Sequence, residues 1–426
     1  MLTQETIGAY CALLHHELIP ATGCTEPIAI AYAAALMRRT LGALPERMHV
    51  CVSGNILKNA KSVVVPGTNG KKGIAAAAAA GAVAGDCDRL LEVIDGITPE
   101  QREQIDSYLQ TAQILVACAD VGLTLDIRIT GWLGTDTAFI RIAGAHTNVV
   151  RIERNGEIVL DLPVAPAGYE SNAPDILNTA DIVAFADTVD LDLVRAPLMR
   201  QLTMNMTIAE YGMRQRCGAN IGHVLLCEGN GDIVARARAY AAAGSDARMS
   251  GAELPVVIVS GSGNQGITAS VPIAIWARER GFSKEALLRA LIVSDLVTIH
   301  QKTGIGRLSA FCGAVCAGCG AGAGIAYLEG FGYDGVAHTV VNALAIISGM
   351  VCDGAKASCA AKIAVAVDAG ILGYRMYTQK QEFVSGDGIV VKGVDNTIRN
   401  IGRLAKDGMR ETETEILSMM LETETK

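Results

Sequence analysis

Two segments of this chain consist largely of small residues, and they restrict the folds that the chain can adopt. Residues 73–85 are nearly all alanine, glycine and valine, and residues 308–328 carry no charge over 21 positions. Alanine and glycine gain little free energy in lipid, so we expect both segments to be buried helices of a soluble protein. With 46 glycines and only 4% aromatic residues, the interior is predicted to be helices packed closely through small side chains.

The remaining patterns predict two lobes, as the length of 426 residues also suggests. Alternating residues from about 124 to 162, with a hairpin turn at Asn155-Gly156, indicate an antiparallel sheet. We predict an α+β fold, predominantly helical, with an Ala/Gly-rich helical core lobe and a smaller lobe with an antiparallel sheet. The expected parts are N-terminal helices at 1–47 that pack on the helical lobe, an α/β lobe at 48–165, a linker at 163–174 and a helical lobe at 166–426.

The charge and the N-terminus restrict the partners and the compartment. The net charge of -8 and the lack of any lysine or arginine block argue against nucleic acid or an anionic membrane, so a small molecule is the expected ligand. The first ten residues show neither a basic nor an apolar signal region, so we expect a cytoplasmic protein. In that reducing compartment the twelve cysteines are better explained as metal ligands, a catalytic thiol and buried residues than as disulfides.

Five cysteines in the last third of the chain could bind a metal. Cys312, Cys316 and Cys319 form a C-x3-C-x2-C run, and Cys352 and Cys359 form C-x6-C. Iron-sulfur clusters need thiolates that converge, and zinc accepts the same ligands. No second CxxC pair and no histidine stands at a zinc-like spacing, which favours an iron-sulfur cluster.

The C-x3-C-x2-C run also has the spacing of radical S-adenosylmethionine enzymes. Here the run falls in an Ala/Gly-rich helix late in the chain, with no room for a following barrel of strands. Cys316 and Cys319 are therefore better explained as small residues that let helices pack closely.

Cys24 is a second candidate, because the sequence T-G-C-T-E-P places it just before a predicted helix at 28–41. A helix N-terminus lowers the pKa of a nearby thiol, so we expect a thiolate that could act as a base or a nucleophile. The alternative is a turn cysteine without a role.

Two glycine-rich loops could bind a substrate. Each follows a β-branched run and precedes a helix: VVVPGTNGKKGI at 63–74 and VVIVSGSGNQGI at 256–267. Their backbone N–H groups suit a carboxylate or a phosphate, although neither loop has the P-loop pattern. An ordinary solvated turn is the alternative for the first loop.

Taken together, five motifs resemble the L-cysteine desulfidase family, which is related to the α chain of iron-sulfur L-serine dehydratases. They are A-T-G-C-T-E-P, P-G-T-N-G-x-x-G, G-S-G-N-Q-G, G-R-L-S-A-x-C-G-A and G-M-V-C-D-G-A-K-x-x-C, in this order along most of the chain. The resemblance implies a 4Fe-4S cluster on three cysteines and Cys24 as the proton acceptor. The implied cluster ligands are Cys312, Cys352 and Cys359, and the implied substrate-binding residues are Thr25, Glu26, Thr68, Asn69, Gly70, Asn264 and Gln265.

The resemblance also implies an activity, namely β-elimination without pyridoxal phosphate, by which L-cysteine gives pyruvate, ammonia and hydrogen sulfide. The seven-residue separation of Cys352 and Cys359 is shorter than in the dehydratases and favours the desulfidase branch. An L-serine ammonia-lyase with the same cluster and a non-catalytic iron-sulfur sensor are the alternatives. A homodimer is compatible with the resemblance.

Overall fold

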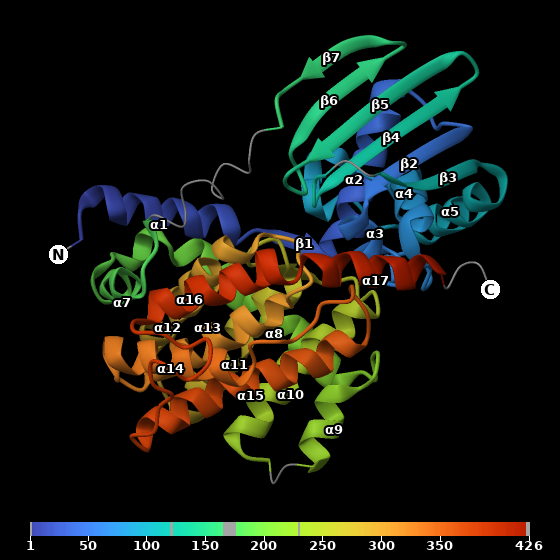
Figure 1. The fold of residues 1–426 in the computed structure, drawn as a ribbon. Coiled ribbons are helices and arrows are strands. Elements are labelled where there is room, and N and C mark those ends of the chain that lie inside the picture. The colour runs from blue at the N-terminus through green and yellow to red at the C-terminus, as the bar shows by residue number, and fades with distance from the viewer. Residues whose placement is uncertain (1, 120–121, 165–175, 229–230, 423–426) are drawn as a thin grey trace.

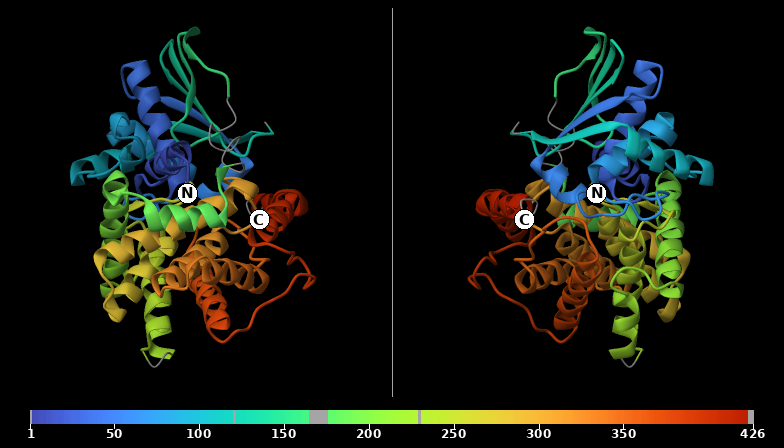
Figure 2. Two further views of the ribbon diagram at one scale, coloured as in Figure 1. Left: turned by 90° about the vertical axis from the view of Figure 1, so that its left-hand side faces the viewer. Right: turned by 90° about the vertical axis from the view of Figure 1, so that its right-hand side faces the viewer.

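The computed structural model describes residues 2–119, 122–164, 176–228 and 231–422. Figure 1 shows a smaller lobe with a six-stranded sheet above a larger lobe of helices, and the side views of Figure 2 show the same arrangement. The predicted α+β, predominantly helical fold is therefore confirmed. Within these ranges, no helix combines the length and the apolar character that crossing a membrane requires. The predicted linker at 163–174 lies mostly outside the described residues.

The six-stranded sheet has the strand order β3-β2-β4-β5-β6-β7. Its neighbours are antiparallel except β2 and β3, which run parallel because helices connect them. The predicted hairpin is confirmed, since Asn155 and Gly156 both have positive φ and join the last two strands. The strands are β2 (Arg47–Ser53), β3 (Gln113–Ala119), β4 (Asp126–Leu133), β5 (Asp136–Ala143), β6 (Val149–Arg154) and β7 (Glu157–Asp161).

Helices α2 and α4 pack on each other and against this sheet, where their alanines form its core. A Cβ atom at Gly81 of α4 would lie 2.0 Å from the carbonyl oxygen of Ala31 in α2, so only glycine permits this approach. The alanine-rich segment is thus the buried helix that the sequence predicted. The helices of this lobe are α2 (Thr25–Leu41), α3 (Gly54–Ala60), α4 (Gly73–Ala84), the 3-10 helix η1 (Cys87–Glu92) and α5 (Pro99–Thr111).

The N-terminal segment, expected to pack as a whole on the helical lobe, divides between the two lobes. Helix α1 (Gln4–Glu17) buries Tyr10 and Leu14 in the helical core, whereas α2 belongs to the sheet core. The short strand β1 (Pro20–Thr22) lies between them and pairs antiparallel with β8 (Pro255–Val257) of the helical lobe. This pairing holds the turn that contains Cys24 at the junction of the lobes.

The helical lobe is built around α13, which contacts α11, α12, α14 and α15. Glycines make its contact with α15: a Cβ atom at Gly322 would lie 2.4 Å from the carbonyl oxygen of Gly370. The predicted close packing of small residues is therefore observed here as well. The lobe contains α7 (Thr179–Thr188), η2 (Leu191–Leu193), α8 (Arg195–Arg214), α9 (Ile221–Glu228), α10 (Ile233–Met249), α11 (Gly263–Arg280), α12 (Lys284–Ile305), α13 (Gly313–Leu328), α14 (Gly332–Ile346), α15 (Ser358–Thr378), α16 (Val394–Arg403) and the π-helical turn η3 (Leu404–Gly408).

The last helix, α17 (Arg410–Glu422), lies along the junction beneath α3 (Figure 1). Although none of its residues is buried, it is tied to α3 by an ion pair between Glu413 and the fully buried side chain of Lys58. The ammonium of Lys61 also donates to the carbonyl of Met420 at 2.6 Å. The tail is therefore attached to the sheet lobe.

The glycine contact between α13 and α15 predicts the effect of one added methyl group. Gly322→Ala would press Cβ against backbone atoms that cannot rotate away, so we expect the free energy of unfolding to fall by about 1–3 kcal/mol. Gly8→Ala in the exposed part of α1, where nothing lies within 4 Å, should instead be neutral or stabilise by up to about 1 kcal/mol. Urea unfolding of both variants measures the difference, and equal effects would contradict the close approach.

Asp295 of α12 predicts a pH dependence of stability. Burial raises its pKa to about 7, although the Gln201 amide donates to it at 2.8 Å. Because the folded protein holds this proton more tightly than the unfolded chain, the contribution to stability is complete below about pH 4 and is lost as the pH rises through about 7. Asp295→Asn, which keeps the acceptor for Gln201, should raise the urea midpoint more at pH 8 than at pH 5. An equal rise in the urea midpoint at pH 8 and at pH 5 would show that Asp295 does not become charged in this pH range.

Candidate active site

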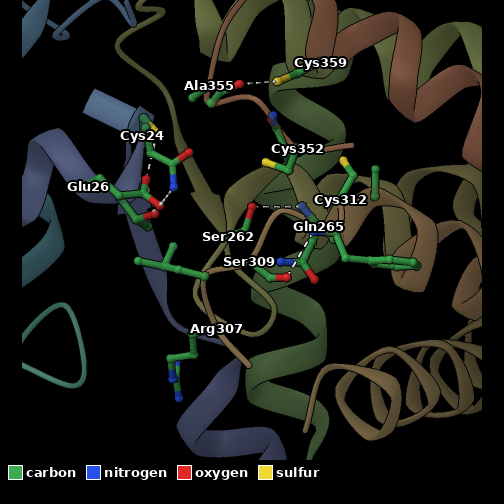
Figure 3. Close-up of a pocket in the computed structure, with 18 of the residues that line it drawn as sticks. Cys24, Glu26, Ser262, Gln265, Arg307, Ser309, Cys312, Cys352, Ala355 and Cys359 are labelled. Atoms are coloured by element: carbon green, nitrogen blue, oxygen red, sulfur yellow. Dashed lines mark hydrogen bonds between the residues drawn. The ribbon is translucent and has the colours of Figure 1, made fainter. Parts of the chain in front are cut away.

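A cavity of about 100 Å³ lies where the two lobes meet, and Figure 3 shows the side chains around it. Its lining comes from the start of α2, the end of α10, the loop before α11, and the segments that precede α13 and α15. The structure thus brings together residues that are more than 300 positions apart in the sequence. The predicted site residues on its wall are Cys24, Thr25, Glu26, Asn264, Gln265, Cys312, Cys352 and Cys359.

Backbone pairing positions the three candidate cluster ligands. Cys312 is the residue that precedes α13, and Cys359 lies in the first turn of α15. The Cys312 amide donates to Met350 at 3.0 Å, and the Cys352 amide donates to Ala310 at 2.6 Å, so these two segments are held side by side. In Figure 3 the three thiols lie on one side of the cavity, opposite Cys24.

The electrostatic environment favours a thiolate at Cys352. A hydrogen bond from the Cys312 thiol lowers the pKa of Cys352 to about 6 against the effect of burial, and the positive charges of Lys58 and Lys362 lower it further. The same bond, together with burial, raises the pKa of Cys312. Cys352 is therefore the thiol of this pair that ionises more readily, and metal binding at such a site would require both thiols to lose their protons.

The chemistry of these side chains fits an iron-sulfur cluster. Cys312, Cys352 and Cys359 reach the cavity wall from segments that precede or begin helices of the helical lobe. Thiolates are the usual ligands of such clusters, and Lys58 and Lys362 supply positive charge near Cys352. Within the described ranges, no three His, Cys, Asp or Glu side chains come close enough to hold one metal ion.

Cys316 and Cys319 do not line this cavity. Both are fully buried within α13, where burial raises the pKa of Cys316 to about 11. Both belong to the core of the helical lobe, which agrees with the interpretation that they are small packing residues.

Cys24 lies directly before α2, as expected, but its predicted thiolate character needs correction. Burial and the negative charge of Glu26 raise its pKa well above 9, so they outweigh the helix dipole. The neutral thiol donates to the carboxylate of Glu26 at 3.0 Å. Cys24 is also packed with Met249, Val63 and Cys359, so it faces the candidate cluster ligands.

Glu26 is the negative centre of this part of the site. It accepts hydrogen bonds from Cys24, from the Thr25 hydroxyl at 3.1 Å and from the Asn59 amide at 3.2 Å. Burial alone would raise its pKa, but the buried His146, 3.9 Å away, outweighs burial and the pKa falls to about 2. Glu26 is therefore a buried, charged carboxylate in hydrogen-bond contact with the Cys24 thiol.

Sequence reasoning missed several residues of the site. His146 comes from the loop between β5 and β6, Lys58 from α3, and Arg248 from the last turn of α10. None of them belongs to a motif or to a local spacing pattern. Long-range packing brings Arg248 to the cavity wall, His146 to within 3.9 Å of Glu26, and Lys58 near enough to Cys352 for its charge to lower the pKa of that thiol. The signal that could have found them is tertiary contact, which one sequence does not reveal.

The Thr68–Gly70 turn lies outside the cavity wall. The Thr68 hydroxyl donates to Val65 at 2.7 Å, whereas Asn69 and Gly70 are exposed. The β-branched run before this turn forms only an isolated bridge between Val64 and Lys72, not the predicted strand, because the chain reverses over glycines with positive φ. The turn is nevertheless near Cys24, since Pro66 packs directly on Gly23. Its carboxylate-binding role stays a prediction.

The cavity wall predicts which cysteines retain iron. Cys312→Ala, Cys352→Ala and Cys359→Ala should each remove most of the iron from anaerobically purified protein, because each removes a thiol from the cavity. Cys316→Ala and Cys319→Ala are the matched controls from α13 and should keep the wild-type iron content. Iron and acid-labile sulfide assays measure both. Loss of iron in either control would restore the C-x3-C-x2-C interpretation.

Comparison with known proteins finds one matching family model and several relatives of similar length. The family model of the serine dehydratase alpha chain matches residues 88–418. A UPF0597 protein of Desulfitobacterium hafniense is 55% identical over 97% of this chain and 96% of its own length. A UPF0597 protein of Treponema denticola is 44% identical over 97% of both chains, and one of Finegoldia magna is 46% identical over 97% of this chain and 99% of its own.

Proposed function

The chain belongs to the serine dehydratase α-chain family, a family of lyase-type enzymes, and on this basis we propose that it eliminates hydrogen sulfide from L-cysteine. The products are pyruvate, ammonia and hydrogen sulfide. The observation that carries this proposal is that Cys24 faces Cys312, Cys352 and Cys359 across one cavity. A proton acceptor and a set of metal-binding thiols on opposite walls suit β-elimination, in which a proton and a leaving group depart from adjacent carbons.

Cys312, Cys352 and Cys359 would hold a 4Fe-4S cluster. Bound by only three protein thiolates, such a cluster keeps one iron open as a Lewis acid for the departing sulfur. Lys58 and Lys362 favour the thiolate of Cys352. Burial raises the pKa of Cys359, and the charges of Lys356 and Lys362 act against this rise.

The Cys24–Glu26 pair would move the proton. Because Cys24 is a neutral thiol at rest, its sulfur can accept the Cα proton only as its own proton passes to Glu26, 3.0 Å away. The Cα–H bond breaks, the new S–H bond forms, and the bond from Cβ to the leaving sulfur breaks, so that the sulfur would depart as HS−. The proton held by Glu26 would then pass to HS−, which releases hydrogen sulfide and restores the Glu26 carboxylate. The resulting aminoacrylate is released, tautomerises to the imine, and is hydrolysed by water to pyruvate and ammonia.

L-Serine is the second candidate substrate, and the family match to serine dehydratase favours it. The same cavity would serve both substrates, which differ only in the leaving atom. Comparing the rates of pyruvate release from L-cysteine and L-serine separates the two. A protein that holds the cluster and releases pyruvate from neither would be a sensor.

Cys24→Ala tests the proton transfer. It should keep the iron content but lower kcat for hydrogen sulfide release by about 10²- to 10⁴-fold, because the proton acceptor is missing. Glu26→Gln should lower kcat in the same direction. Cys51→Ala, in strand β2 away from the cavity, is the matched control and should leave kcat unchanged. A fully active Cys24→Ala enzyme would disprove the role proposed for Cys24.

A further inference from the structure

Arg248 carries buried hydrogen-bond donors that the described protein does not use. Its side chain lines the cavity from the last turn of α10, and the residue is 2% exposed. One terminal nitrogen, Nη1, donates to the Asn264 side chain at 3.2 Å. In the described ranges, Nε and Nη2 have no hydrogen-bond partner. Buried N–H groups without acceptors are costly, so these two donors favour a ligand that enters the cavity.

The two unpaired nitrogens define the shape of that ligand. Nε and Nη2 lie on the same edge of the planar guanidinium, and their N–H groups are parallel. This edge matches the two oxygens of a carboxylate, with which arginine forms paired hydrogen bonds. Asn264 holds the opposite side of the group and so fixes its plane. The N–H groups of Nε and Nη2 can therefore donate two parallel hydrogen bonds to one planar anion such as a carboxylate.

The residues around the Arg248 guanidinium also favour a negatively charged ligand beside it. Gly263, Asn264 and Gln265 form the first turn of the long helix α11, whose N-terminus carries a positive partial charge. A Cβ atom at residue 263 would lie 2.5 Å from Nε of Arg248, so glycine keeps this approach open. The carbonyl oxygen of the Gln265 side chain, also buried without a partner, faces the same cavity and suits an ammonium group.

We propose that Arg248 binds the α-carboxylate of the substrate. The inference rests on the proposed function for the identity of the substrate, an α-amino acid. Arg248 and Cys24 line the same cavity of about 100 Å³, so a carboxylate held by Arg248 would place the adjacent Cα near the proposed proton acceptor. The Thr68–Gly70 turn is the competing candidate for the same carboxylate, but it does not line the cavity.

The test compares two thiols that differ in the carboxylate. Anaerobic calorimetry of the cluster-loaded protein measures the affinity for 3-mercaptopropionate, which has a thiol and a carboxylate, and for ethanethiol, which has the thiol alone. Wild-type protein should prefer 3-mercaptopropionate by about 10- to 100-fold, as charged hydrogen bonds predict. Arg248→Gln should reduce this preference to less than about threefold, and Arg248→Lys should restore it only in part.

Two further variants make the test sharper. Asn264→Asp would place a carboxylate beside Nη1 and neutralise Arg248, so it should weaken the preference about tenfold while the arginine remains. This variant decides the matter if Arg248→Gln does not fold. Arg236→Gln, on the same helix but paired with Glu279 at the surface, is the matched control and should change nothing. A preference that survives both Arg248→Gln and Asn264→Asp would overturn the proposal.

Calorimetry keeps this inference separate from the reaction. If L-cysteine releases no hydrogen sulfide but the carboxylate preference depends on Arg248, the binding role stands and the proposed reaction is wrong. If hydrogen sulfide is released and the preference does not depend on Arg248, the reaction stands and the binding role is wrong.

Discussion

The close packing of α13 against α15 is the contact on which the candidate site depends. Cys312 immediately precedes α13, and Cys359 lies in the first turn of α15, so the distance between these helices sets the distance between two thiols. Backbone meets backbone at Gly322 and Gly370, where no side chain separates the helices. A metal-binding constellation needs positions fixed to a fraction of an ångström, and backbone contacts provide that better than flexible side chains do.

The lobes contribute different chemistry to the cavity. The sheet lobe supplies Cys24 directly before α2, Glu26 in its first turn, and His146 from the loop after β5, which lies 3.9 Å from Glu26. The helical lobe supplies the thiols and Arg248. Two contacts fix the position of the sheet lobe against the helical lobe: β1 pairs with β8, and Gly354 packs against the backbone of Lys58. Neither lobe alone contains the complete arrangement.

Much of this architecture could be predicted from the sequence, because local patterns encode it. The small-residue helices, the hairpin at Asn155-Gly156 and the position of Cys24 before a helix all follow from spacing and turn chemistry. The protonation of Cys24 could not be predicted, since desolvation and Glu26 outweigh the helix dipole only after folding. His146 and Arg248 were missed for a similar reason, because their roles come from contacts across the chain.

The ion pair between Lys58 and Glu413 connects the charge near the cavity to a helix that does not line it. Lys58, whose charge lowers the pKa of Cys352, pairs with a carboxylate of α17. None of the residues of α17 is buried, so this helix is held partly by that ion pair. A change that loosened α17 would therefore alter the charge near Cys352 without changing any residue of the cavity wall.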